Sequence, residues 1–319
     1  MTLITSDIEV VKQELINGGI VPIPTETVYG LAGNIYSDAA LSKIFELKNR
    51  PFFNPLIVHI KSIHELQKIA SEIPEKALKL ASAFWPGPLT LILKKQPEIS
   101  DIVTAGKDTV AVRVPNHKVA LALLENLDFP VAAPSANPFG SISPTSATHV
   151  FEYFKGKIPY ILEGGNCKKG VESTIIGFVN NEPILYRHGS ISIEEIEKIV
   201  GKVTLLTLKE DAPDAPGMLA KHYAPNTPIF LTSNLKELIK LHQGKKIGLL
   251  LFKAKMEDNN IAVQEILAPN GNLEVATSNL YAALHKLDKC NLDVIIAEIF
   301  PAVGLGNTIN DRLERATKK

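Results

Sequence analysis

Short apolar runs alternate with stretches of helical apolar spacing along the first 200 residues, and this alternation is the most restrictive feature of the chain. The runs are short enough for buried strands, and the stretches between them place apolar residues on one helix face. Such alternation predicts a sheet with helices packed on it, in an α/β or α+β arrangement. Strands are expected at 20–23, 56–60, 90–93, 110–114, 131–133, 159–162 and 174–178, and helices at 39–47, 65–70, 75–84 and 119–127.

The pattern changes at the segment from Asp211 to Pro228, which is rich in Pro, Ala and Asp and has no periodicity. Each proline removes a backbone donor and disfavours helix in the residue before it, so the segment reads as a linker. Its middle nevertheless carries Met218, Leu219, His222 and Tyr223, where a plain spacer would carry Ser, Gly or charge. Two interpretations stay open. These residues either attach the linker to a domain surface, or the linker covers a site and Tyr223 touches a ligand.

Beyond the linker, four apolar runs and three helical patterns predict a second, smaller α/β domain. The strands are expected within 228–232, 246–252, 262–267 and 293–299, and the helices within 233–243, 272–289 and 307–319. The predicted layout is therefore a first domain at 1–205, a linker at 206–227 and a second domain at 228–319.

Charge and composition exclude several classes of protein. Lys plus Arg and Asp plus Glu number 34 each, so the overall field gives no reason to expect polyanion binding. The two cysteines form no CxxC pair, which argues against a disulfide framework or a cysteine zinc site. The amino terminus does not resemble a signal peptide, and no apolar run approaches the ~20 residues of a membrane helix. We expect a cytoplasmic protein.

The common nucleotide and hydrolase motifs are absent from the sequence. There is no GxxxxGK[ST] loop, no GxGxxG, no HExxH and no GxSxG. If this protein is a nucleotide-binding enzyme, it binds the nucleotide with a site other than these common motifs.

Polar residues instead gather where the predicted strands end. PTETVYG follows the first strand, KNRPFFNP precedes the second, and APSANPFGSISPTS follows 131–133. Ligands bind at strand ends in open α/β sheets, and hydroxyls with cations suit an anionic ligand. Each cluster also has a plainer explanation. The serine-rich loop could be an ordinary surface loop, and Lys48 with Arg50 a solvated helix end.

Two charged or titratable residues lie inside apolar strands. His59 is more often a hydrogen-bonded, half-buried residue than a ligand contact in such a setting. Arg113 is costly in an apolar strand unless it is paired, either with a structural partner such as Glu26 or with an anionic ligand. We favour the ligand slightly.

Taken together, PTETVYGLAGN, KNRPFFNPLIVHI, FWPGPLTLIL, AVRVPNH, APSANPFGSISPTS, ESTIIGF and YRHGSIS resemble the YrdC-like family. With APGMLAKHYAP and the second domain, the chain resembles the long, two-domain threonylcarbamoyl-AMP synthase family. The resemblance implies a twisted, open, mixed sheet with helices, followed by a smaller Rossmann-like α/β domain. It also implies that L-threonine, bicarbonate or CO2, and ATP with Mg2+ give threonylcarbamoyl-AMP and pyrophosphate.

The resemblance carries roles onto matching positions of this sequence. It implies that the L-threonine pocket contains Thr27, His59, Arg113, Ala133 and Ser173. It implies that the ATP side contains Lys48, Arg50, Asn54, Thr109, Ser135, Ser143, Arg187 and Tyr223. No metal ligand from a protein side chain is implied, and Glu26 is expected only to pair with a cation.

The implied partner is a separate tRNA threonylcarbamoyl transferase, which would receive the product for adenosine beside the anticodon. Direct tRNA binding is expected to be weak or absent, and no membrane partner is expected. The main alternative is an RNA-binding or ribosome-maturation module without catalysis, which the lack of interleaved basic and aromatic residues disfavours. A carbamoyl-adenylate enzyme of hydrogenase maturation is a second alternative, but its acylphosphatase and zinc-finger regions are not visible here.

Overall fold

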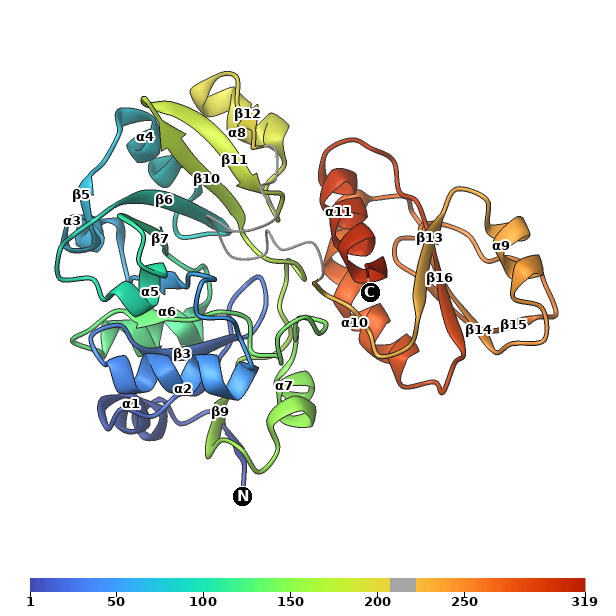
Figure 1. The fold of residues 1–319 in the computed structure, drawn as a ribbon, viewed down its shortest axis with the longest axis horizontal. Helices are drawn as coiled ribbons and strands as arrows, with labels where there is room; N and C mark the ends of the chain where they lie inside the picture. Colours follow the sequence, from blue (N-terminus) through green and yellow to red (C-terminus); the bar gives the residue numbers. More distant parts are fainter. Residues whose placement is uncertain (207–221, 319) are drawn as a thin grey trace.

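A computed structural model describes residues 1–206 and 222–318 of the chain (Figure 1). Its largest sheet has ten strands, in the order β12-β11-β10-β6-β7-β4-β8-β3-β2 with β5 paired to β6. The pairing is mixed, because β4 runs parallel to β7 whereas β6 runs antiparallel to it. The predicted mixed sheet is thereby confirmed.

The first part of the chain contains the following elements. The strands are β1 Leu3–Thr5, β2 Val21–Ile23, β3 Gly30–Asn34, β4 Ile57–His59, β5 Ala70–Glu72, β6 Leu89–Lys95, β7 Thr109–Arg113, β8 Val131–Ala132, β9 Tyr160–Leu162, β10 Thr174–Val179, β11 Glu182–Arg187 and β12 Thr204–Leu205. The helices are α1 Ile8–Ile16, α2 Asp38–Lys48, α3 Leu66–Ile69, α4 Glu75–Phe84, α5 Asp101–Thr104, α6 Lys118–Glu125, α7 Ala147–Phe154 and α8 Ile193–Val200.

The pleat of the sheet sorts side chains onto two faces. In β7, Val110 and Val112 join the main core, whereas Ala111 belongs to a small cluster on the other face. In β6, Leu91 lies in the main core and Ile92 on the opposite face. Because successive strand residues point to opposite sides, Arg113 shares the face of Ala111. Helices α4 and α8 contribute to the core on the first face, whereas Ile57, Ala111 and Ile92 form only a small cluster on the second.

The second part of the chain forms a separate four-stranded sheet in the order β13-β16-β14-β15, with every pair parallel. Its elements are β13 Ile229–Thr232, α9 Leu235–Leu241, β14 Ile247–Leu251, β15 Ile261–Ile266, α10 Leu273–Asp288, β16 Val294–Glu298 and α11 Leu305–Thr317. Helix α9 packs with Leu249, and helices α10 and α11 pack with Leu250, so both faces are covered. Helices on both faces of a parallel sheet make a small Rossmann-like domain, as the resemblance implied.

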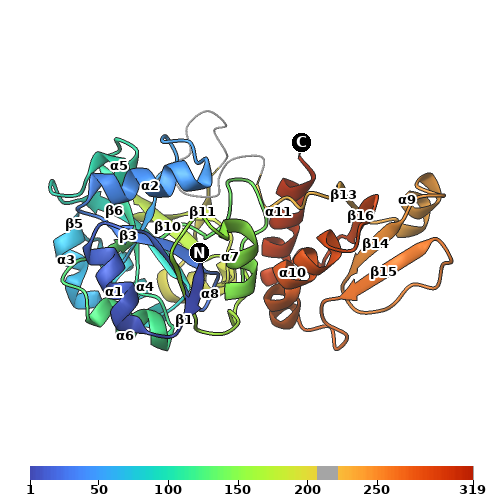
Figure 2. The ribbon, with the colours of Figure 1, turned by 90° about the horizontal axis from the view of Figure 1, so that it is seen from below.

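Helices α10 and α11 lie between their own sheet and the first part of the chain (Figure 2). Their side chains share one core with Val28, Ile142 and Val171 of the first part. The two parts are therefore joined by apolar packing.

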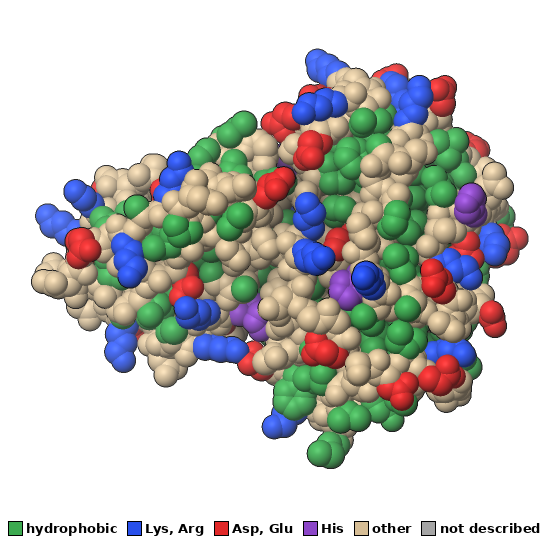
Figure 3. All heavy atoms as spheres, turned by 180° about the vertical axis from the view of Figure 1, so that it is seen from behind, with side chains coloured by type: hydrophobic (Ala, Val, Ile, Leu, Met, Phe, Trp, Pro, Cys, Tyr) green, Lys and Arg blue, Asp and Glu red, His purple; other side chains and the backbone are tan. Residues whose placement is uncertain are grey.

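Seen from behind, the surface of the molecule carries acidic and basic side chains interspersed with one another (Figure 3).

The structure departs from the predicted elements in a few places. Gly30–Asn34, inside the polar run that follows the first predicted strand, is strand β3 and pairs antiparallel with β2. The helix expected at 65–70 ends at Ile69, because Ala70 begins β5. The predicted linker at 206–227 has residues 207–221 outside the described part, Met218 and Leu219 among them, so the domain boundaries stay predictions. No helix of the described residues is long and apolar enough to cross a membrane.

Candidate active site

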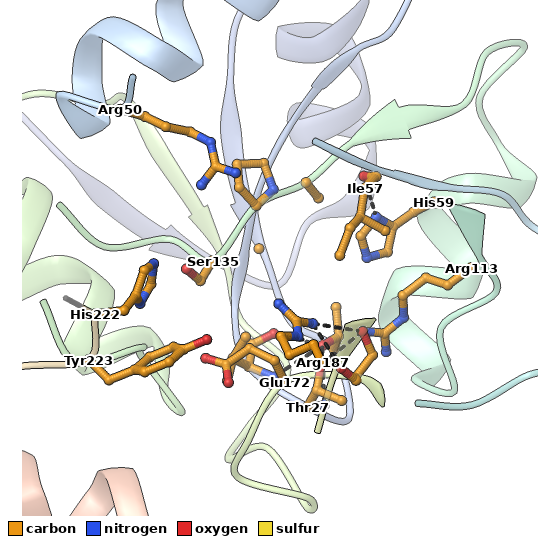
Figure 4. Close-up of a pocket in the computed structure, with 16 residues that line it drawn as sticks. Thr27, Arg50, Ile57, His59, Arg113, Ser135, Glu172, Arg187, His222 and Tyr223 are labelled. Carbon is orange, nitrogen blue, oxygen red and sulfur yellow. Dashed lines mark hydrogen bonds between the residues drawn. The ribbon is translucent and has the colours of Figure 1, made fainter. Parts of the chain in front are cut away.

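A pocket opens on the face of the large sheet opposite the main core. Strand ends, the β2–β3 turn, the loop after β8, and His222 and Tyr223 all contribute to it. In Figure 4, Arg50, Ser135, His222 and Tyr223 lie on one side, and His59 and Arg113 lie on the other. The lining residues are Thr25, Thr27, Val28, Gly30, Arg50, Ile57, His59, Arg113, Ala133, Pro134, Ser135, Glu172, Ser173, Arg187, His222 and Tyr223.

The β2–β3 turn is held by its own hydroxyls. Thr25 Oγ1 lies 2.8 Å from Thr27 Oγ1 and donates a 2.6 Å hydrogen bond to the Val28 carbonyl. Such a local bond fixes a turn that has no ladder partner of its own. The Thr27 hydroxyl is thereby presented to the pocket.

Arg113 is paired with a structural carboxylate and also lines the pocket. Its Nη2 lies 2.6 Å from Glu26 Oε1, and its Nη1 donates to Thr27 Oγ1 at 3.1 Å. Both side chains of the ion pair are buried, as a costly strand cation requires. The expected partner Glu26 is therefore confirmed, while Arg113 Nε has no hydrogen-bond partner among the described residues.

His59 is buried beside Arg113, its neighbour across the β4–β7 pair. Its Nδ1 lies 3.2 Å from the Ile57 carbonyl, which can only accept, so Nδ1 carries the proton. Burial, and then the charge of Arg113, lower the pKa of His59 to about 3. A neutral imidazole thus turns its Nε2 acceptor toward the pocket, and the residue is both hydrogen-bonded in the strand and part of the lining.

Ser173 and Arg187 both line the pocket and are hydrogen-bonded to each other. Arg187 donates from Nε and Nη2 to the Ser173 carbonyl at 3.1 and 2.9 Å, and from Nη2 to Ser173 Oγ at 3.1 Å. Thr90 Oγ1 lies 2.7 Å from Ser173 Oγ. Burial lowers the pKa of the Arg187 guanidinium, so its charge would gain from an anion in the pocket.

Arg50 is aimed into the pocket by the turn after α2. Asn49 has a left-handed backbone with φ 51°, and Arg50 then donates to the Asn54 carbonyl, Asn54 Oδ1 and the Pro55 carbonyl at 3.1, 2.7 and 2.7 Å. All three acceptors are uncharged. Burial, and then the charge of Arg187, lower the pKa of Arg50. Arg50 and Lys48 are both buried, so the alternative of a solvated helix end is wrong.

Glu172 is a carboxylate in the pocket lining that the sequence analysis did not single out as a site residue. It accepts from Ser143 Oγ at 2.6 Å, from Tyr281 and from Arg312 Nε at 2.9 Å. Burial would raise its pKa, but the charges of Arg312 and Arg187 and the Ser143 hydroxyl lower it to about 2. The sequence carries no local signal for this group, because Arg312 and Tyr281 lie 140 and 109 residues away.

Comparison with known proteins agrees with this architecture along the chain. Residues 13–189 match a family of Sua5, YciO and YrdC proteins described as "Telomere recombination", and residues 191–317 match the threonylcarbamoyl-AMP synthase C-terminal domain. The threonylcarbamoyl-AMP synthase of Pyrococcus abyssi is 42% identical over 312 residues, which cover 94% of this chain and 91% of that protein. That of Bacillus subtilis is 41% identical, over 93% of this chain and 89% of that protein. The chain belongs to the threonylcarbamoyl-AMP synthase family.

Solved structures give the same result for the fold. The crystal structure of P. abyssi Sua5 complexed with L-threonine is 40% identical, has a TM-score of 0.91 and covers 99% of this chain and 97% of that one. Escherichia coli YciO is 22% identical with a TM-score of 0.51, and covers 59% of this chain and 94% of its own. The YciO likeness shows the fold alone.

Nine of the thirteen site residues expected for this synthase family line the one pocket. All five of the threonine set do so, together with Arg50, Ser135, Arg187 and Tyr223 of the ATP set. Three other expected residues do not line the pocket but form hydrogen bonds with residues that do, or with the loop that carries them. Lys48 Nζ donates to the Ser135 and Asn137 carbonyls at 2.6 Å each, Asn54 holds Arg50, and Ser143 donates to Glu172.

Thr109 is the one expected residue that the structure keeps apart. It lies at the start of β7 in a neighbouring hollow, which Ile92, Phe178 and Tyr186 also line. It shares the face of Arg113 but lies four residues along the strand, about 13 Å away at about 3.3 Å per residue. The apolar side chains Ile57, Ile92, Ala111 and Ile175 form a strip on the same face.

Proposed function

We propose that this protein forms threonylcarbamoyl-AMP and pyrophosphate from L-threonine, bicarbonate or CO2, and ATP. The observation that carries the proposal is one pocket with two chemically distinct sides. Neutral and paired groups at Thr27, His59 and Arg113 suit a small hydroxy amino acid. Buried cations at Arg50 and Arg187 suit phosphates. The family membership and the threonine complex of the P. abyssi relative support the same reaction.

On the threonine side, Arg113 would bind the substrate carboxylate. Its Nε is buried without a described partner, and Glu26 fixes the plane of the guanidinium. The Nε2 of neutral His59 would accept a hydrogen bond from the amine or hydroxyl of threonine. Charge-assisted hydrogen bonds of this kind orient a small substrate without adding a protein nucleophile.

The proposed chemistry then runs in two steps. The threonine amine attacks the carbon of CO2 formed from bicarbonate, an N–C bond forms, and the nitrogen loses a proton to give a carbamate. A carbamate oxygen next attacks the α-phosphorus of ATP, and the bond to the β-phosphate oxygen breaks, so pyrophosphate leaves. Negative charge accumulates near the phosphates, where preorganised cations stabilise it best. Arg50 and Arg187 would supply them.

ATP would lie along the sheet face from Arg50 and Arg187 toward Thr109. The apolar strip of Ile57, Ile92, Ala111 and Ile175 would then support the nucleobase, and Thr109 would contact the far end of the nucleotide. This path explains how Thr109 could serve ATP from a neighbouring hollow.

Mg2+ would arrive on the phosphates as part of the nucleotide substrate. Among the described residues, no three His, Cys, Asp or Glu side chains are grouped so as to hold a metal ion. Glu172, the carboxylate in the pocket lining, is already paired with Arg312. Mg2+ commonly uses few protein ligands when substrate phosphates are present.

The product would pass to a separate transferase that acts on tRNA.

The proposal is tested by pyrophosphate release from ATP and Mg2+, with threonine and bicarbonate omitted in turn and serine as a substitute. We expect release to require both substrates and to be weaker with serine. Equal release without threonine would contradict the proposal.

A further inference from the structure

We infer that Arg312 of the second domain is a positioning residue for the nucleotide side of the pocket, acting through Glu172 and Tyr223. This inference rests on the proposed function. It assigns the second domain a part in the active site: helix α11 neutralises a carboxylate that the first domain places beside the proposed phosphates.

The first contact is a fully buried ion pair between the two domains. Arg312 has no exposed surface, and its Nε lies 2.9 Å from Glu172 Oε2. Its Nη2 donates to the His188 carbonyl at 2.7 Å, and its Nη1 pairs with Asp311. The guanidinium is therefore fixed from three directions, and it joins α11 to the chain immediately after β11.

The second contact is with the ring of Tyr223. The Arg312 guanidinium lies over this ring at 4.7 Å from its centroid, and Tyr281 stacks nearby at 5.8 Å. Tyr281 also donates to both Glu172 oxygens, at 3.1 and 2.9 Å. Tyr223 is buried, and its hydroxyl has no hydrogen-bond partner among the described residues although the residue lines the pocket. The second domain thus holds a tyrosine of the pocket lining whose hydroxyl has no hydrogen-bond partner within the described part of the chain.

Charge explains why the first domain needs this cation. An unpaired carboxylate in the pocket lining would repel a triphosphate, and this repulsion is strong in a buried site. Breaking a buried ion pair from one side leaves an uncompensated charge. Without Arg312, Glu172 would either stay charged against ATP or take up a proton, and a protonated oxygen could no longer accept all of the hydrogen bonds from Ser143 and Tyr281.

The test compares the KM values of ATP and threonine in the full-length chain. We expect Arg312→Met to raise the KM for ATP at least tenfold while the KM for threonine changes less than threefold. Adding Glu172→Gln to Arg312→Met should restore most of the ATP affinity, because the repelling charge is gone. Lys289→Met is the matched control, since Lys289 pairs with Glu152 across the same interface but at its exposed edge. It should change neither KM more than twofold.

A pH profile separates electrostatic positioning from simple packing. Arg312 lowers the pKa of Glu172, so Arg312→Met should raise this pKa, and the ATP defect should be smaller at pH 6 than at pH 8. The other titratable groups facing Glu172 are Arg187, His222, Tyr223 and Tyr281. Burial lowers the pKa of His222 to about 3 and raises those of both tyrosines. His222 and both tyrosines therefore stay neutral between pH 6 and pH 8.

Two results would overturn the inference in a wild-type protein that is active. One is an equal rise in the KM values of ATP and threonine that does not depend on pH and is not reversed in the double variant. The other is an Arg312→Met enzyme with the kinetics of Lys289→Met. If Arg312→Met does not fold, the double variant and Arg312→Lys decide the same question. A folded wild-type protein without synthase activity would instead count against the proposed function.

Discussion

At the scale of single residues, the account depends on how the threonine side is held together. Thr27 accepts a hydrogen bond from Arg113 at 3.1 Å and lies 2.8 Å from the Thr25 hydroxyl. The residue therefore both orients a cation and lines the pocket. Glu26 cannot replace it, because its carboxylate already bonds the other end of the guanidinium.

Thr27→Ala should raise the KM for threonine at least tenfold and leave the fold intact. Loss of one hydrogen bond to a charged group costs about 1.5–3 kcal/mol, and about 1.4 kcal/mol corresponds to a factor of ten. The measurement is steady-state kinetics with a thermal unfolding curve for each variant. Thr27→Ser keeps the hydroxyl and is the control. Unchanged kinetics in Thr27→Ala would remove Thr27 from the site.

At the scale of elements, the last residue of α2 clamps the loop after β8. Lys48 is buried and donates to two carbonyls of this loop, and the Phe139 amide donates back to the Lys48 carbonyl at 2.7 Å. Burial, and then Arg50, lower the pKa of Lys48 well below its usual range. Helix α2 thereby sets where Ser135 lies in the pocket.

Lys48→Met should weaken ATP binding through Ser135, because the loop loses both clamping bonds. We expect the KM for ATP to rise severalfold in the wild-type background and much less in a Ser135→Ala background. A double-mutant cycle on the KM for ATP measures this coupling. Lys12→Met, in an exposed pair on α1, is the control. Fully additive effects would mean that Lys48 acts on the nucleotide independently of Ser135.

Much of this element-level architecture could be predicted from the sequence. Apolar runs such as 110–114 mark strands directly, and polar residues at strand ends mark the pocket. Strand β3 was missed because Gly30 to Asn34 contains two glycines and follows a turn, so its apolar signal is weak. The Glu172–Arg312 pair could not be predicted, because pattern reasoning sees neighbours in sequence and this pair joins two domains.

At the scale of the whole molecule, buried neutral histidines should make the fold sensitive to acid. Burial is the first cause that lowers the pKa values of His59, His222 and His285 to about 3. In the unfolded chain these groups take up protons below about pH 6.5, whereas the native state does so only near pH 3. Stability from these groups is therefore lost as pH falls from about 6.5 toward 3.

Each buried histidine should lower the free energy of unfolding by roughly 1.4 kcal/mol between pH 7.5 and 5.5. Urea unfolding at the two pH values measures the difference, and His285→Gln should reduce it. His64→Gln replaces an exposed histidine and should leave the difference unchanged. A free energy that does not fall with pH in the wild type would show that these imidazoles are protonated in the native state.

The most direct test of the central claim is the mass of the product formed from ¹³C-bicarbonate, L-threonine and ATP with Mg2+, analysed quickly because the adenylate hydrolyses. We expect one species that contains AMP, threonine and the labelled carbon, and that disappears when any substrate is omitted. AMP without the labelled carbon, from folded protein that binds ATP, would contradict the account. A salt-sensitive shift with tRNA in the absence of ATP would then favour an RNA-binding module.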